Sequence, residues 1–203
     1  MPTSITPLLK DDETDVVRTF ITKRLAENKK YRENMPSSHL MQIGMNSMIV
    51  PATEADGSQI QDITTRAGVF SQEEIDSVPE MFNEYLRDGA EGSGYHFIVY
   101  REGDQVLGFA IYGFRDLTDG VYDLYWIAVD PSARSNGVGR ALLTASEDAV
   151  RAMGGRMLIA ETSGTPLYEP TRKFYVSNGY ENEATIKDFY TPGDDLKIFI
   201  KRI

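Results

Sequence analysis

One stretch, residues 124–143, constrains the fold of this chain more than any other part of it. Six consecutive apolar residues, Leu-Tyr-Trp-Ile-Ala-Val, lead through Pro131 and a polar loop into a segment with apolar residues at helical spacing. A strand that is apolar at every position is typical of one covered on both faces. The sequence therefore predicts a mixed α/β (α+β) fold, in which helices pack on both faces of a central sheet.

Periodicity and turn residues extend this prediction along the chain. Alternation indicates strands, three- and four-residue spacing indicates helices, and glycine or proline marks their ends. The expected strands lie at residues 47–51, 96–101, 105–114, 121–129, 157–161, 182–187 and 196–201, and the expected helices at 52–66, 71–86, 137–153 and 170–178. This order predicts a mixed, mostly antiparallel sheet of six or seven strands. Residues 11–34 are expected to form a preceding helix, and residues 36–46 an irregular segment.

Composition and charge exclude several classes of protein. The 203 residues contain no cysteine and only two histidines, which excludes thiol nucleophiles and cysteine-ligated metals and predicts no metal site. The formal net charge of −10 opposes binding to nucleic acid or to an anionic membrane. The chain starts without a secretory signal, and its apolar runs are far shorter than the roughly 20 residues that span a bilayer. We therefore expect a soluble, cytoplasmic protein.

The loop between the apolar strand and its helix has the features of a phosphate-binding turn. Gly137 and Gly139 place no side chain in the way of a ligand, and the first amides of a helix are unpaired at the positive end of its dipole. A diphosphate suits such a turn. A P-loop would need lysine where Arg140 stands, and a dinucleotide fold would need glycine in place of Leu142. What remains is Arg-x-x-Gly-x-Gly at residues 134–139.

This hexapeptide resembles the signature of the GNAT superfamily of acyl-coenzyme A-dependent N-acetyltransferases, which is Gln/Arg-x-x-Gly-x-Gly/Ala after the fourth strand. Residues 170–180 are similar to the late helix of that family: Phe174-Tyr175, three further residues, Gly179 and the aromatic Tyr180. The two motifs have the family's order and separation. The resemblance covers residues 45–203 and implies the GNAT fold, in which two splayed strands hold coenzyme A. Residues 1–44 would form a helical extension.

The resemblance implies acetyl-CoA as the co-substrate, held largely by main-chain atoms. Its pantetheine arm would bond to the backbone of the apolar strand, and its pyrophosphate would lie on the amides of the glycine loop, with arginines available for charge pairing. The expected cofactor-binding residues are Ile127, Ala128, Val129, Arg134, Ser135, Asn136, Gly137, Val138, Gly139, Arg140 and Arg172. Many members carry an asparagine seven residues before the late-helix tyrosine, where this chain has Tyr168. We expect this difference to change how the arm is held.

The resemblance also implies direct transfer, in which an amine attacks the thioester and no acyl-enzyme forms. The attacking ammonium must lose a proton, and the departing thiolate must gain one. Tyr175 matches the family's usual acid. Asp123 is the expected base, and Glu161 at the end of the following strand is its rival. Alternation would put Asp123, Tyr125, Ile127 and Val129 on one strand face, and Asp130 is explained better as a strand-ending turn.

The sequence allows more than one prediction for the acceptor and for the activity. The acceptor is expected between the first two helices of the domain and residues 188–195. Its lining would be acidic and aromatic, although the same side chains would equally suit a dispersed surface: Tyr112, Phe114, Asp116, Asp119, Tyr122, Asp123 and Tyr190. The first hypothesis is an N-acetyltransferase for a primary amine of a small molecule, amino acid or peptide, acting through a ternary complex. The second is a non-catalytic acyl-CoA sensor or scaffold. A third hypothesis makes the helix at residues 11–34 a dimerisation arm of a homodimer.

Overall fold

The structure, a computed structural model, describes residues 41–42 and 47–203. The helix expected at residues 11–34 and the domain boundary expected between residues 44 and 45 lie outside the described residues, as does most of the segment 36–46. The two described residues of that segment, expected to be irregular, form a short strand, β1 (Met41–Gln42), paired with the strand that follows.

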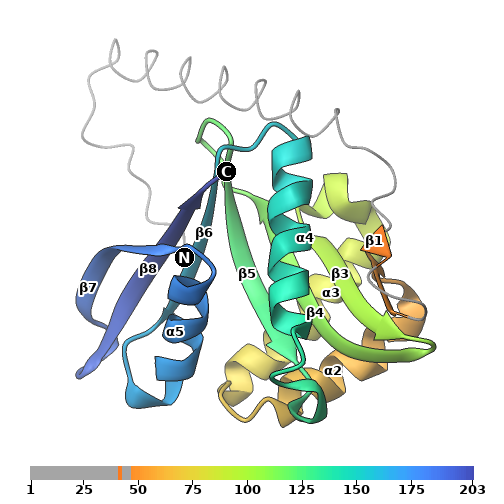
Figure 1. Cartoon of the computed structure of the whole chain (residues 1–203), viewed down its shortest axis with the longest axis horizontal. Coiled ribbons are helices and arrows are strands. Elements are labelled where there is room, and N and C mark those ends of the chain that lie inside the picture. Colours follow the sequence, from red (N-terminus) through yellow and green to blue (C-terminus); the bar gives the residue numbers. More distant parts are fainter. Residues whose placement is uncertain (1–40, 43–46) are drawn as a thin grey trace, which may run out of the picture.

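The described residues form one sheet in the order β1-β2-β3-β4-β5-β6-β8-β7 (Figure 1). Neighbouring strands run antiparallel except β5 and β6, which are parallel. The longer strands are β2 (Ser47–Pro51), β3 (His96–Glu102), β4 (Gln105–Phe114), β5 (Val121–Val129), β6 (Met157–Ser163), β7 (Glu181–Thr191) and β8 (Asp194–Arg202). The mixed, mostly antiparallel sheet expected from the sequence is confirmed.

Helices cover both faces of this sheet, as expected. The helices are α2 (Gly57–Arg66), α3 (Gln72–Ser93), α4 (Val138–Ala152) and α5 (Glu169–Ser177), and the short 3₁₀ turns are η1 (Glu54–Asp56), η2 (Pro131–Ala133) and η3 (Pro166–Tyr168). A capping box at Ser71 begins α3, because Glu74 accepts from the Ser71 amide at 2.7 Å and donates its own amide to the Ser71 hydroxyl. Helix α3 does not end near Leu86 as expected. It kinks at Gly89, where φ is 70°, and continues.

Each face of the sheet has its own hydrophobic core. On one face α2 and α3 bury Ile60, Ile63 and Phe82 against β3 and β4. On the other face α4 and α5 bury apolar side chains such as Leu142 and Tyr175 in a core that includes residues of β3, β4, β5, β6 and β8. Strand β5 contributes to both cores, with Leu124 in the second and Ala128 in the first. Burial on both faces explains why this strand is apolar along most of its length.

Strands β5 and β6 pair only along their first halves. The ladder begins at Val121 and Met157 and ends where Leu124 lies beside Ala160, although both strands continue. Beyond that point they diverge, and α5 and α4 lie on either side of the widening gap (Figure 1). The splayed strand pair expected from the family resemblance is therefore present.

A bulge in β5 overturns one expectation about its faces. Ile111 of β4 lies opposite Trp126, and the next residue, Tyr112, lies opposite Leu124, so Tyr125 is an extra residue without a partner on β4. A bulge shifts the alternation by one residue. Asp123, Tyr125, Ile127 and Val129 therefore do not share a face. Ile127 and Val129 pack with Leu124 against the α4 side, whereas Asp123 lies on the opposite face.

Candidate active site

The loop between β5 and α4 presents unpaired amides. Ser135 and Gly137 both have positive φ, at 66° and 82°, and the first bond of α4 runs from the Ala141 amide to the Gly137 carbonyl at 2.9 Å. The amides of the first helical residues therefore have no partner within α4. Amides gathered by positive-φ turns at a helix start form a concave anion site. The local geometry fits the pyrophosphate expected here.

A buried carboxylate holds this loop in shape. Asp130, 2% exposed, accepts from the Ser132 amide at 2.9 Å and from its hydroxyl at 2.6 Å, and it pairs with Arg66 of α2 at 2.6 Å. The Ser132 hydroxyl, followed by its amide and the neighbouring arginines, keeps the pKa of Asp130 below its usual range. Asp130 caps η2, as expected for a strand-ending turn.

Two arginines expected to contact the cofactor are bonded to main-chain carbonyls. Arg134 donates to the Ala67 carbonyl just after α2 at 2.7 Å. Arg172 donates to the carbonyls of Ser163 and Thr165 at 2.7 and 2.8 Å. Both side chains thus fix the walls of the site, Arg134 by tying the glycine loop to α2 and Arg172 by tying α5 to the end of β6.

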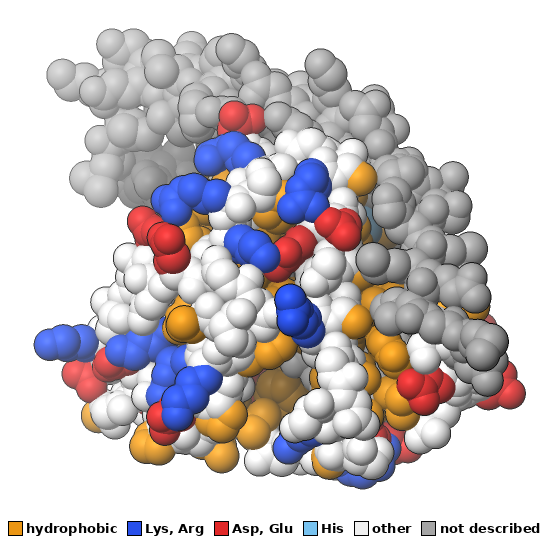
Figure 2. All heavy atoms as spheres, viewed as in Figure 1, with side chains coloured by type: hydrophobic (Ala, Val, Ile, Leu, Met, Phe, Trp, Pro, Cys, Tyr) orange, Lys and Arg blue, Asp and Glu red, His pale blue; other side chains and the backbone are white. Residues whose placement is uncertain are grey.

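Beyond Leu124, the edge of β5 that faces β6 has no strand partner among the described residues. Ile127, Ala128 and Val129 pair with β4 on their other edge. Main-chain groups on an unpaired edge need a hydrogen-bonding partner, which an extended amide-containing chain can supply. Figure 2 shows a recess with hydrophobic side chains at its floor between α5 and the loop that precedes α4. The residues present therefore fit the arm and the pyrophosphate of coenzyme A.

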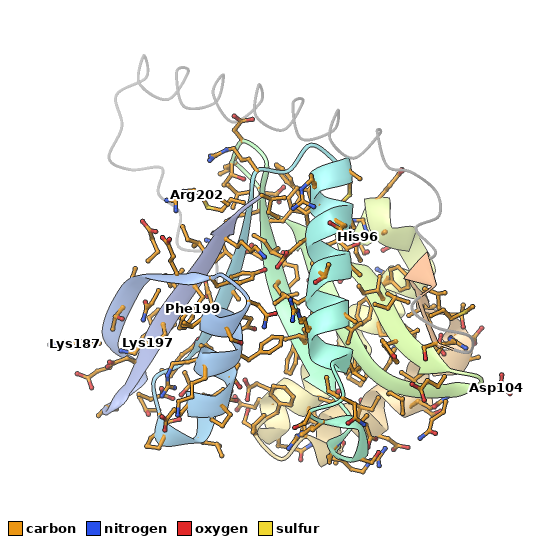
Figure 3. All side chains as sticks on the ribbon, in the orientation of Figure 1. His96, Asp104, Lys187, Lys197, Phe199 and Arg202 are labelled. Carbon is orange, nitrogen blue, oxygen red and sulfur yellow. The ribbon has the colours of Figure 1, made fainter. Side chains whose placement is uncertain are left out.

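Tyr175 lies deep between α5 and the sheet. Its ring is 4% exposed and packs at 5.5–5.6 Å from the rings of Phe174, Tyr180 and Phe199, the last of which is labelled beside α5 in Figure 3. Burial raises the pKa of its hydroxyl above the usual value. The buried hydroxyl is therefore a weaker acid than a solvent-exposed tyrosine.

The structure brings the two rival bases together through a residue that the sequence did not single out. Arg115, just after β4, donates through Nε to both oxygens of Asp123 at 2.9 Å and through Nη2 to Glu161 at 2.9 Å. Burial raises the pKa of Asp123, and the Arg115 charge opposes that shift. The only local signal for Arg115 in the sequence is a cation just after a predicted strand. Its contact with Glu161, 46 residues away, depends on strand pairing and is not visible in the sequence.

The loop between α2 and α3 borders the same region. Tyr168, which stands where many family members have asparagine, donates its hydroxyl to the Val69 carbonyl at 2.8 Å, and burial raises its pKa to about 12. Phe70 packs edge-on against Trp126 at 4.5 Å. The loop is therefore fixed to both walls of the site.

Three aromatic residues expected to line the acceptor pocket are buried in the core instead. Tyr112, Phe114 and Tyr122 are core residues, between 2% and 9% exposed, and so do not line a pocket. Alternation and aromatic character in the sequence do not distinguish a strand face that packs in the core from one that lines a pocket. Tyr190 remains half exposed, and burial, followed by the charge of Glu161, raises its pKa.

The described part of the chain has neither a metal-binding cluster nor a membrane-spanning helix. Its His, Asp and Glu side chains form no group of three or more that could hold a metal ion. None of its helices combines the length and apolar character needed to cross a bilayer.

Comparison with known proteins identifies the family. Residues 93–182 match the family model described as an acetyltransferase (GNAT) domain. A crystal structure of a protein from Desulfovibrio desulfuricans, assigned to the GNAT family as an acetyltransferase, is 41% identical with a TM-score of 0.75, over 77% of this chain and 98% of that one. No curated protein sequence matches the chain.

More distant structures share the fold. The ribosomal-protein-S18-alanine N-acetyltransferase from Escherichia coli is 22% identical with a TM-score of 0.62, over 77% of this chain and 94% of its own. A protein from Salmonella typhimurium solved with its cofactor acetyl-CoA is 19% identical with a TM-score of 0.60, over 77% and 94%. The chain belongs to the GNAT family of acetyltransferases. The predicted fold and the predicted class, an acetyl-CoA-dependent N-acetyltransferase, are confirmed.

Proposed function

We propose that this protein moves an acetyl group directly from acetyl-CoA to a primary amine of a small molecule, amino acid or peptide, within a ternary complex. The observation that carries the proposal is the divergence of β5 and β6 after Leu124 and Ala160, next to the unpaired amides at the start of α4. Acetyl-CoA, when bound, supplies the acetyl group as a thioester. The amides of residues 134–140 and the free edge of β5 would hold it.

Tyr175 is the proposed acid that protonates the departing sulfur. Its position on the α4–α5 side of the gap supports this role. Asp123 and Glu161 lie on the other face, where one carboxylate would accept the proton of the acceptor ammonium. Separation of acid and base by the sheet allows the amine and the thioester to approach from opposite sides.

The side chains around the expected acceptor region favour a cationic amine. The region between the α2–α3 loop and the β7–β8 hairpin contains Tyr168, Tyr190 and acidic side chains, which suit a cationic amine. Because two structural neighbours are described as ribosomal-protein alanine N-acetyltransferases, short peptides with a free amino terminus belong in the test alongside small amines and amino acids.

The test is release of free thiol from acetyl-CoA by the purified protein with each amine, together with mass spectrometry of the acceptor. Replacement of Tyr175 by Phe should lower kcat about 10²-fold, the usual contribution of a general acid, and leave the affinity for coenzyme A unchanged. Tyr180→Phe is the matched control, because Tyr180 lies in the same aromatic cluster, with its ring 5.5 Å from that of Tyr175. Coenzyme A binding without thiol release from any amine would instead support the sensor hypothesis.

A further inference from the structure

A guanidinium shared by two carboxylates stands where β5 and β6 begin to separate. Arg115 contacts Asp123 of β5 with both Nε and Nη2, the latter at 2.8 Å, and it contacts Glu161 of β6 with Nη2 alone. Asp123 lies beside Ile159, two residues before Glu161, so the cluster lies at the last rungs of the β5–β6 ladder. It faces away from α4 and α5, because Leu158 and Ala160 point to the core on that side.

The two carboxylates differ in how much of their bonding capacity is used. The Asp123 side chain is 13% exposed, and both of its oxygens accept from Arg115. The Glu161 side chain is 40% exposed and accepts one bond, through Oε1, so its Oε2 has no protein partner among the described residues. A carboxylate must have an accessible oxygen to accept a proton from a substrate. Only Glu161 meets that condition.

We propose that Arg115 is a positioning residue: Asp123 anchors it, and it holds Glu161 at the separation of β5 and β6 with one oxygen directed to accept the proton of the acceptor ammonium. The inference rests on the proposed function. The N–H proton passes to Glu161, directly or through water, and returns to solvent after transfer. Arg115 and Asp123 neither gain nor lose a proton in this step.

Other groups face this cluster and shape its response to pH. Tyr125, the bulged residue of β5, has its pKa raised to about 12 by burial and then by the charge of Asp123, with Asp116 and Tyr95 adding to the shift. Burial, followed by the charges of Glu161, Asp194 and Glu74, raises the pKa of Tyr190 on β7. The other charged groups named here are acidic, and within the described part of the chain Arg115 is the cation paired with both Asp123 and Glu161.

The experiment measures kcat, the KM for acetyl-CoA and the pH profile of kcat/KM, with the best acceptor found above. Glu161→Gln should lower kcat about 10²- to 10³-fold, as expected for loss of a general base. Arg115→Met should lower kcat about 10-fold or more with the KM for acetyl-CoA unchanged, and Arg115→Lys should recover part of it. In Arg115→Met the acid limb of the profile should move up by about one pH unit, because a carboxylate without its neighbouring cation holds a proton more tightly.

A double variant separates positioning from folding. Arg115→Met alone leaves a mostly buried carboxylate unpaired, which can lower stability. Arg115→Met with Asp123→Asn removes both charges, so it should restore the unfolding temperature and keep the low kcat of the single variant. Arg87→Met is the matched control, since Arg87 forms a comparable carboxylate pair with its exposed neighbour Asp88 on α3.

The outcomes separate this inference from the function on which it depends. Thiol release by the wild type but unchanged kcat and pH profile in Arg115→Met would overturn the inference alone. So would recovery of kcat in the double variant, or an Asp123→Asn variant as slow as Glu161→Gln. A wild type that releases no thiol with any amine would overturn the proposed function and the inference with it.

Discussion

The two ends of β5 each carry an aspartate, Asp130 buried and Asp123 mostly buried, and the surroundings of the two carboxylates shift their pKa values in opposite directions. Asp130, after the last residue of the strand, is satisfied by Ser132 and Arg66, and its pKa lies below the usual range. Asp123, near the first residue, has its pKa raised, because burial outweighs the attraction of Arg115. One end of the strand is therefore fully stabilised, whereas the other carries a charge that the fold only partly compensates.

The opposite pKa shifts of the two aspartates agree with the different role proposed for each end of β5. At the Asp130 end, main-chain amides would bind the pyrophosphate, so the side chains serve to hold the backbone in place. At the Asp123 end, side chains would move protons, and such sites commonly hold perturbed carboxylates. Substitution should thus cost stability at one end and catalytic rate at the other.

The same substitution at both ends gives the largest expected contrast in stability. Asp130→Asn should lower the free energy of unfolding at pH 7 by about 2 kcal/mol, because it weakens hydrogen bonds to a buried charge. Asp123→Asn should change it by less than about 0.5 kcal/mol, since the neutral amide relieves an incompletely compensated burial. Urea unfolding of the two variants measures both values, and equal losses would break the comparison.

The pH dependence of that contrast has a definite sign. A carboxyl whose pKa is lower in the folded than in the unfolded protein adds stability above its unfolded pKa, about 3.9, and this stability is lost as pH falls through the folded pKa. The deficit of Asp130→Asn relative to wild type should therefore be full at pH 7 and disappear at the acid end. Urea unfolding of both proteins from pH 7 to the acid end measures this deficit. A deficit that grew as the pH fell would contradict a lowered pKa for Asp130.

Two glycines of the cofactor loop give the next largest effect. Gly137→Ala should cost about 1–2 kcal/mol, because φ at this position is 82° and an L side chain is strained there. It should also weaken coenzyme A binding measured by calorimetry, since the amides of the loop would shift. Gly139→Ala should have a much smaller effect: an added Cβ would meet Val129 and Phe174 at 3.4–3.6 Å, which is ordinary contact.

The smallest expected effect concerns Ser135, whose φ of 66° is unusual for a residue with a side chain. Ser135→Gly should stabilise the protein by about 0.5 kcal/mol, because relief of the strained backbone slightly exceeds the entropy that glycine adds to the unfolded chain. Coenzyme A affinity should be unchanged if the loop binds through its amides. A large loss of affinity would instead assign a contact to the Ser135 hydroxyl.

Local pattern was enough to determine most of the fold. Strands β4 and β5 have the predicted bounds, and α4 and α5 agree with prediction to within a residue at each end. These elements depend on side-chain periodicity and on the glycines and prolines that end them, which are properties of neighbouring residues. The glycine loop and its exposed amides were predictable for the same reason.

Long-range contacts decided the rest of the site. The extra residue at Tyr125 places Asp123 and Ile127 on opposite faces of the sheet. Arg134 and Arg172 donate to main-chain carbonyls of other segments, 67 and 9 residues away, which local spacing does not predict. The meeting of Arg115, Asp123 and Glu161 requires the register between β5 and β6, which no local spacing fixes. The sequence by itself determined which residues could bind and react, and only the tertiary structure decided which of them share a face, because strand pairing is set by the whole sheet.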